Sequence, residues 1–271
     1  MTYREDLRAW HEQKMLGGQN YYFIFEGREL IPRPEQCYWL ATHRAEIMRL
    51  LDISSSDRFV DVGCGEGYFT FVLAQRASSS VGVDISFNAL SVARARWGYD
   101  SAKLTLVIAS GDCLPLPDAC CDELLCHHTL EHVIDDAAFV REMYRVLRPG
   151  GSAVVGVPQT FSWQIVFLAR IRRRLLPNSR FLTIEKTKPG ELVPELIGRK
   201  SHIRFYSIDA LCRLMEGNEF RIVEKIGICL HTPSSLKLAF RRNAVLFHLG
   251  TLLSKRWPQL GSDILVKAVK V

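Results

Sequence analysis

The segment from Asp61 to Gly67 holds the densest group of residues that could bind a ligand or take part in a reaction. It reads Asp-Val-Gly-Cys-Gly-Glu-Gly. Glycines at alternate positions permit a tight turn and let a bound molecule approach the backbone closely. Asp84 follows 17 residues after Gly67, at the end of a predicted strand. A carboxylate there can accept hydrogen bonds from both hydroxyls of a ribose. The two segments together predict a site for a nucleoside-containing molecule.

A nicotinamide dinucleotide is one alternative ligand for this arrangement, but two details argue against it. Asp61 precedes the glycines, where it can meet an ammonium group. Dinucleotide sites usually have GxGxxG spacing and a helix N-terminus open to pyrophosphate. The spacing here is GxGxG, and Glu66 would lie close to that anion. A nicotinamide oxidoreductase is therefore the least favoured function.

Two further polar turns follow the third and fourth predicted strands. Asp112 lies in Ser-Gly-Asp-Cys-Leu-Pro, where an acid can accept a hydrogen bond from the exocyclic amine of an adenine. Leu-Glu-His at 130–132 follows the fourth strand, directly after His127, His128 and Thr129. Both turns are candidates for the walls of the same site.

These side chains need a scaffold that brings the ends of successive strands together. Short buried strands are predicted at 58–62, 81–83, 104–108, 123–126 and 152–157, with helices at 68–76, 88–97 and 135–147. This alternation predicts an α/β fold, with a doubly wound, mostly parallel, Rossmann-like sheet and helices on both faces. Ligands of such sheets lie beyond the carboxyl ends of the strands, where all of these turns fall.

Together the motifs resemble the family of class I S-adenosylmethionine (SAM)-dependent methyltransferases, whose members run from VLDVGCGTG to LKPGG. The resemblance extends in order and spacing from Phe59 to Gly151, with Glu66 in place of the Thr of that pattern. It continues more weakly in an HxRF segment at 202–205 and in a helix that leads to the last strands.

The resemblance implies that SAM is the cofactor and assigns a part of it to each motif. The glycine loop binds the methionine end, the acid after the second strand the ribose, and the turn after the third strand the adenine. The implied residues are Asp61, Gly63, Cys64, Gly65 and Gly67 for the methionine end, Asp84 and Ile85 for the ribose and one adenine face, Asp112 and Cys113 for the adenine edge, and His127 beside the methionine moiety.

Methyl transfer from a sulfonium is an in-line displacement, so the enzyme must hold the acceptor close and remove its proton if it is an alcohol or phenol. We expect His128 to be the base, because the turn after the fourth strand faces the cofactor. His202 and Glu131 are the other catalytic candidates. No metal is expected.

Two patterns in the sequence resemble metal sites, and neither favours a bound metal. His-Thr-Leu-Glu-His at 128–132 fits the HxxEH pattern of inverted zinc peptidases, but its first histidine is expected in a turn and not on a helix. Cysteines near His127, at positions 120, 121 and 126, are expected in or beside a core strand. The chain has eight cysteines and no CxxC, and we expect them to be reduced.

Charge and hydropathy bear on the acceptor and the location. The net charge is +6, and the segment 159–201 alone carries nine bases and three acids. Basic amphipathic helices are predicted around 163–176 and 236–257, of the kind that lie on anionic membranes. The chain shows no secretory signal and no apolar run of spanning length. We expect a cytoplasmic enzyme, in part peripheral to a membrane, that methylates oxygen on a small-molecule or lipid-linked acceptor, which the basic segments suggest is anionic.

The predicted organisation has four parts: an N-terminal helical cap at 1–57, the SAM-binding core at 58–158, a basic helical lid insert at 159–201, and the completion of the sheet at 202–271. Two alternatives stay open at this point, an RNA or protein methyltransferase and a catalytically inactive SAM-binding scaffold. Nucleic acid is the less favoured partner, because no NPPY-like tetrapeptide follows the fourth strand.

Overall fold

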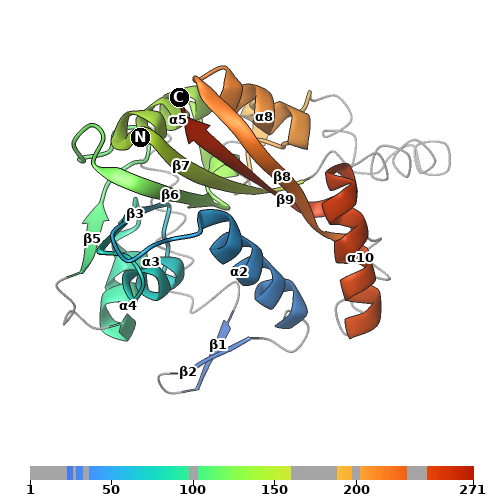
Figure 1. Ribbon diagram of the computed structural model, residues 1–271, viewed down its shortest axis with the longest axis horizontal. Coiled ribbons are helices and arrows are strands. Elements are labelled where there is room, and N and C mark those ends of the chain that lie inside the picture. Colours follow the sequence, from blue (N-terminus) through green and yellow to red (C-terminus); the bar gives the residue numbers. More distant parts are fainter. Residues whose placement is uncertain are drawn as a thin grey trace.

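A seven-stranded sheet organises the chain, as a computed structural model shows (Figure 1). The structure describes residues 23–26, 29–32, 37–97, 103–159, 188–196, 202–230 and 243–271. The strands of the sheet are β3 (Arg58–Val62), β4 (Ser79–Asp84), β5 (Leu104–Ile108), β6 (Cys121–His127), β7 (Leu147–Pro158), β8 (Phe220–Leu230) and β9 (Gly261–Lys270). Their spatial order is β5-β4-β3-β6-β7-β9-β8.

The first five strands run parallel, and the last two close the sheet in antiparallel pairing. All five strands predicted from the sequence are present, and β8 and β9, within the segment predicted to complete the sheet, form its antiparallel part. The α/β, Rossmann-like prediction is confirmed. β3 lies between β4 and β6. The chain passes from β3 outward to β4 and β5 on one side and then crosses to β6 and β7 on the other, so the turn after β3 marks the point at which such sheets bind ligands.

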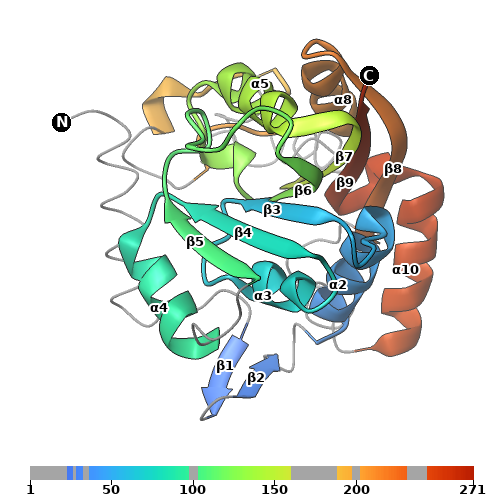
Figure 2. The same cartoon turned by 60° about the vertical axis from the view of Figure 1, so that its left-hand side comes forward.

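Helices cover both faces of this sheet (Figures 1 and 2). The α-helices are α2 (Cys37–Leu51), α3 (Tyr68–Ala74), α4 (Phe87–Trp97), α5 (Asp136–Val146), α8 (Ile208–Glu216) and α10 (Ala244–Arg256), and short 3-10 turns are η2 (Leu130–His132), η3 (Pro194–Leu196) and η4 (Pro258–Leu260). One face carries α5 and α8, and the other carries α2, α3, α4 and α10.

Alternation along the central strands divides the core into two layers. In β7, Val155 belongs to the layer under α5 and α8, whereas Val154 belongs to the layer under α2, α3 and α10. In β9, Val266 and Leu265 divide in the same way. Both layers are apolar because a sheet covered on both faces needs apolar residues at successive positions.

The N-terminal part differs from the helical cap expected over residues 1–57. Strands β1 (Phe23–Glu26) and β2 (Glu29–Pro32) form an antiparallel hairpin, with Glu26 paired to Glu29. Their aromatic and β-branched residues favour extended backbone, which explains the hairpin in place of a helix. The helix expected after the hairpin is present as α2.

Most of the predicted lid falls outside the described residues, and so do the helix expected around 163–176 and residues 236–242 of the second one. The remainder of that second helix is α10. The boundaries of the four predicted parts stay a prediction. None of the helices in the described ranges is both long and apolar enough to cross a bilayer. The seven cysteines from Cys64 to Cys229 are free thiols.

Candidate active site

The glycine loop between β3 and α3 forms a tight turn between two neighbouring strand ends. Gly63, Gly65 and Gly67 have φ angles of +80°, +53° and +70°, in the left-handed region that glycine adopts without strain. The backbone N–H of Gly63 donates to the carbonyl of Val83 at 2.7 Å. A Cβ on Gly63 would lie 2.1 Å from Oγ1 of Thr129, so only glycine fits there. A Cβ on Gly65 would meet nothing within 4 Å, which leaves room for a ligand beside the loop.

Asp84, at the end of β4, is held by the backbone on both sides of its carboxylate. Gly65 N–H donates to Oδ2 and Ser86 N–H donates to Oδ1, each at 2.8 Å. The carboxylate is therefore fixed against the glycine loop, and a carboxylate oxygen can accept more than one hydrogen bond. Ile85 follows directly and is partly exposed. This arrangement fits the ribose-binding function implied by the resemblance.

Asp61 lies deeper, at 3% exposure, behind the loop. Its Oδ2 accepts a hydrogen bond from the Thr70 hydroxyl at 2.7 Å. Burial raises the pKa of Asp61 to about 7, although the Thr70 hydrogen bond works in the opposite direction. The protein therefore holds here an acid that a nearby cation would ionise.

Glu66, where the sequence departs from the family pattern, attaches the loop to α4. Its carboxylate forms an ion pair with Arg96, and its carbonyl accepts a hydrogen bond from Trp97 Nε1 at 2.7 Å. The Trp97 ring stacks on Phe71, with centroids 4.5 Å apart. Glu66 thus anchors the loop, because one ion pair and one hydrogen bond join it to the helix.

The turn after β5, which carries Asp112 and Cys113, is held in place by α5. A Cβ on Gly111 would lie 2.1 Å from the Phe139 ring, so the backbone packs directly on that helix. Leu114 N–H donates to Glu142 Oε2 at 2.8 Å. Asp112 is partly exposed and Cys113 is exposed. Both can therefore reach a ligand at the carboxyl end of β5, as expected for an adenine edge.

His128, the favoured base, stands in the turn after β6 with a φ of +55°. Its Nδ1 lies 3.3 Å from Glu131 Oε1, and its Nε2 lies 3.4 Å from Asp263 Oδ1. Burial opposes protonation of His128, yet the hydrogen bond to Glu131 and the two carboxylate charges raise its pKa above the ordinary value. Burial also opposes ionisation of Glu131, but the His128 hydrogen bond and the neighbouring histidines lower its pKa to about 2.

The segment that begins at His202 folds back onto Glu131. Ile203 N–H donates to the Glu131 carbonyl at 2.9 Å. The His202 and His132 rings lie 5.0 Å apart in an edge-to-face arrangement. Arg204 is buried and donates from Nη1 to the Gly190 carbonyl at 2.7 Å. All three catalytic candidates are therefore brought into one neighbourhood.

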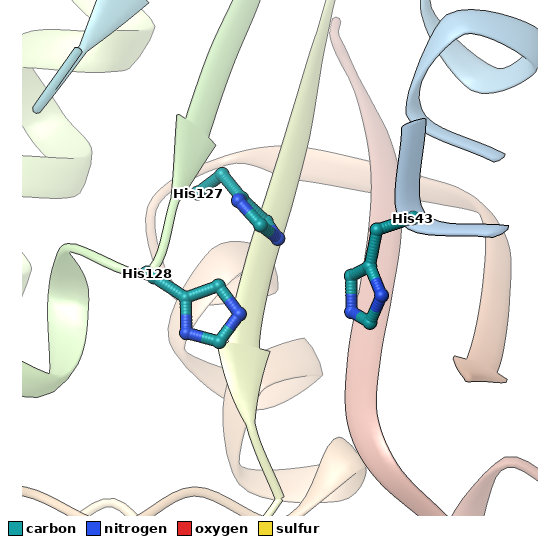
Figure 3. A group of neighbouring side chains, drawn as sticks. All are labelled: His43, His127 and His128. Atoms are coloured by element: carbon teal, nitrogen blue, oxygen red, sulfur yellow. The ribbon is translucent and has the colours of Figure 1, made fainter. Parts of the chain in front are cut away.

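His43 and Asp263 belong to this neighbourhood, and sequence reasoning missed both. His43, on α2, is 1% exposed, and its ring centroid lies 5.6 Å from that of His127 and 6.3 Å from that of His128 (Figure 3). His127 ends β6, and burial together with the two other imidazoles lowers its pKa well below the ordinary value. His43 lies 84 positions before His127, so no local spacing connects them.

Known proteins match the part of the chain that carries these motifs. Residues 60–155 match the family model described as "Methyltransferase domain". A Mycolicibacterium smegmatis protein named "Probable S-adenosylmethionine-dependent methyltransferase" is 36% identical over 141 residues, which are 50% of this chain and 52% of that protein. The malonyl-[acyl-carrier protein] O-methyltransferase of Serratia marcescens is 32% identical over 158 residues, or 55% of this chain and 60% of that one. The chain thus spans about half the length of the curated relatives it matches.

The fold has its own relatives among solved structures. The S-adenosylmethionine dependent methyltransferase of Mesorhizobium loti superposes on this chain with a TM-score of 0.59 at 18% sequence identity. The superposition covers 88% of this chain and 100% of that one. The seven-stranded sheet is the Rossmann-like fold of class I methyltransferases. Residues 60–155 match the methyltransferase domain model, and the relatives that match the same part of the chain include proteins named as S-adenosylmethionine-dependent methyltransferases.

Proposed function

We propose that this protein transfers the methyl group of SAM to an oxygen of a small-molecule or lipid-linked acceptor. The observation that carries the proposal is Asp84, whose carboxylate is fixed by Gly65 and Ser86 beside the open space at the glycine loop. Asp61, Gly63, Cys64, Gly65 and Gly67 would hold the methionine end, Asp84 and Ile85 the ribose, and Asp112 and Cys113 the adenine, with His127 at the methionine moiety.

SAM supplies an electrophilic methyl group on a sulfonium, so the chain has to position the acceptor and manage its proton. His128 is the proposed group that meets the acceptor hydroxyl, and Glu131, 3.3 Å from its Nδ1, orients the imidazole. An imidazole oriented by a carboxylate is the usual arrangement for moving a proton. Glu131 thereby acts as a positioning residue. His202 lies beside His132 at the rim of the same group.

The oxygen acceptor is supported by the Serratia marcescens relative, whose name specifies O-methylation of a carrier-bound malonyl group. The chain's net charge of +6 favours an anionic acceptor. A carboxylate or acidic hydroxyl would satisfy both observations.

We further propose that α10 contacts an anionic membrane surface. Val245, Leu249 and Leu252 are exposed by 67%, 54% and 63%. The helix contains no acid and ends in Lys255, which pairs with Glu46 of α2, and Arg256. An apolar face beside basic residues is suited to the boundary between headgroups and acyl chains. A lipid-linked acceptor would lie at the same boundary.

SAM binding measured by calorimetry tests the central proposal. We expect the parent to bind SAM and Asp84→Ala to lose about 1.5–3 kcal/mol of binding free energy, the value of charge-assisted hydrogen bonds to a ribose. Asp209→Ala, an exposed acid in the first turn of α8, is the matched control and should bind as the parent does. A folded parent that binds no SAM would refute the proposal.

A further inference from the structure

Three histidines from two elements meet at the end of the site where the methyl group would be transferred. His43 comes from α2, His127 is the last residue of β6, and His128 follows it in the turn (Figure 3). One ring nitrogen of each lies within 4.8 Å of those of the other two. The rings are tilted or perpendicular to one another, at 57° for His43 and His127 and 84° for His127 and His128. Perpendicular rings direct lone pairs toward a common point more readily than stacked rings do.

The nitrogen Nε2 of His127 is buried, and no hydrogen-bond partner meets it in the described part of the chain. A buried polar atom without a partner is destabilising and calls for an explanation, such as a bound ion. The Gly156 backbone lies directly against this ring, because a Cβ there would lie 2.5 Å from His127 Cδ2. The His127 imidazole is therefore held in a narrow space, with its Nε2 close to the ring nitrogens of the other two histidines.

Two carboxylates stand on either side of His128. Asp263 lies 3.4 Å from Nε2 and Glu131 lies 3.3 Å from Nδ1. A carboxylate that contacts one imidazole nitrogen fixes the ring and raises the basicity of the other nitrogen, as in many metal sites. Asp263 is in turn fixed, because Ser262 Oγ donates to its Oδ2 at 2.7 Å. The two negative charges would balance a divalent cation.

We propose that His43, His127 and His128 bind a divalent transition-metal ion, with Asp263 as the nearest carboxylate. Imidazole suits zinc, copper, iron and nickel. Tetrahedral coordination with Zn–N distances of about 2.0–2.1 Å needs nitrogens roughly 3.3 Å apart. The ligand nitrogens lie within 4.8 Å of one another, so binding would draw them closer together by up to about 1.5 Å. Three protein ligands leave one position open, which is the usual arrangement of a catalytic ion.

The binding of the ion stands on this geometry, whereas its part in the reaction rests on the proposed function. The ion would bind the acceptor oxygen at its open coordination position and would lower the pKa of the acceptor hydroxyl. His128 would then act as a ligand, and Glu131 would orient it. The acceptor would be an oxygen donor such as a hydroxyl or a carboxylate.

Binding of Co²⁺ to the chelator-treated protein tests the proposal, because tetrahedral Co²⁺ has a visible absorption that needs no acceptor. We expect one equivalent to bind, Zn²⁺ to displace it, and His43→Ala and His43→Gln each to weaken binding at least about 10-fold. His248→Ala, at an exposed histidine of α10, and His202→Ala should bind Co²⁺ as the parent does.

SAM calorimetry on the same variants confirms that they are folded and keeps this test separate from that of the proposed function. A parent that binds SAM but shows no Co²⁺ absorption would overturn the metal site and leave the methyltransferase proposal standing. Loss of Co²⁺ in His202→Ala with full binding in both His43 variants would also overturn it, because the ion would then belong to Glu131, His132 and His202, which also lie within 4.8 Å of one another.

Discussion

At the scale of single residues, the proposed cofactor site contains two carboxyl groups in different environments, those of Asp61 and Asp84. Asp84 is held by two backbone N–H groups at the loop, whereas Asp61 is enclosed and accepts a hydrogen bond from the Thr70 hydroxyl. The difference follows from position in the strands. Asp84 ends β4, and Asp61 is the fourth residue of the central strand β3. Asp84 therefore stands at the loop, where a ligand hydroxyl can reach it, whereas Asp61 is buried and has a raised pKa.

Asp61 should make SAM binding depend on pH. Its pKa of about 7 is raised by burial, so in the free protein the carboxyl is protonated below that pH. An ammonium group beside it favours the ionised form, and binding below pH 7 should therefore release a proton. We expect affinity to rise by up to about 10-fold per pH unit between pH 5 and 7 and then to level off.

Calorimetry in two buffers of different ionisation enthalpy measures the released proton. Asp61→Asn keeps the side-chain shape and removes the titration, so its affinity should be lower and nearly independent of pH. An equally steep dependence in this variant would show that another group is responsible. The same pKa predicts a stability trend: the contribution of Asp61 to the free energy of unfolding is largest below about pH 4 and is lost as the pH rises to 7.

At the scale of elements, α5 positions the adenine turn by contact with its backbone. Asp135 caps this helix, since its side chain accepts from Ala138 N–H at 2.8 Å. Arg145 donates to the carbonyls of Leu114 and Leu116, at 3.0 and 2.8 Å, which ties the other end of the turn to the helix. The turn therefore depends on α5 for its shape.

Gly111→Ala should destabilise the protein through this contact. The new Cβ would lie 2.1 Å from Phe139 Cε2, and the helix would have to shift. Overpacking of this kind costs about 1–3 kcal/mol. Unfolding in urea measures the loss, with Ser110→Ala as the neighbouring control, for which we expect a change below about 0.5 kcal/mol. Equal stability of both variants would mean that the turn and α5 do not pack as described.

At the scale of the whole molecule, the exposed face of α10 stands on the same side of the sheet as α2, which carries His43 (Figure 1). Lys255 of α10 forms an ion pair with Glu46 of α2, so the two helices are joined directly. Contact of α10 with a lipid surface would therefore bring the histidine end of the site close to that surface.

Sedimentation with vesicles tests this contact. We expect association with vesicles that contain anionic lipid and much less with neutral ones. The change Leu252→Gln should weaken association by roughly 5-fold, because about 1 kcal/mol of burial is lost at a side chain that is not fully enclosed. Val223→Gln is the control, at an apolar residue of β8 that is 52% exposed. Equal weakening by both variants, or no association at all, would contradict the proposal.

The sequence by itself determined the sheet and the cofactor motifs. Each strand, turn and helix of the core lies within a short contiguous stretch, such as β3, the glycine loop and α3 between Arg58 and Ala74. Hydrophobic runs, glycine spacing and the acid after the next strand report such local structure directly. The hairpin β1–β2 is also formed by a short contiguous stretch, but it was not predicted, because its local strand signal was outweighed by the helical pattern that follows it.

Only the tertiary structure decided which side chains surround His128. His43, Glu131 and Asp263 come from α2, η2 and β9, and the strand order β6-β7-β9 together with the passage of α2 across the sheet brings them to one place. Spacing along the chain carries no signal for such contacts, since they arise from packing between elements that are more than 80 residues apart, as His43 and His127 are. The anchoring of Glu66 by Arg96 has the same origin, because it depends on how α4 packs beside the loop.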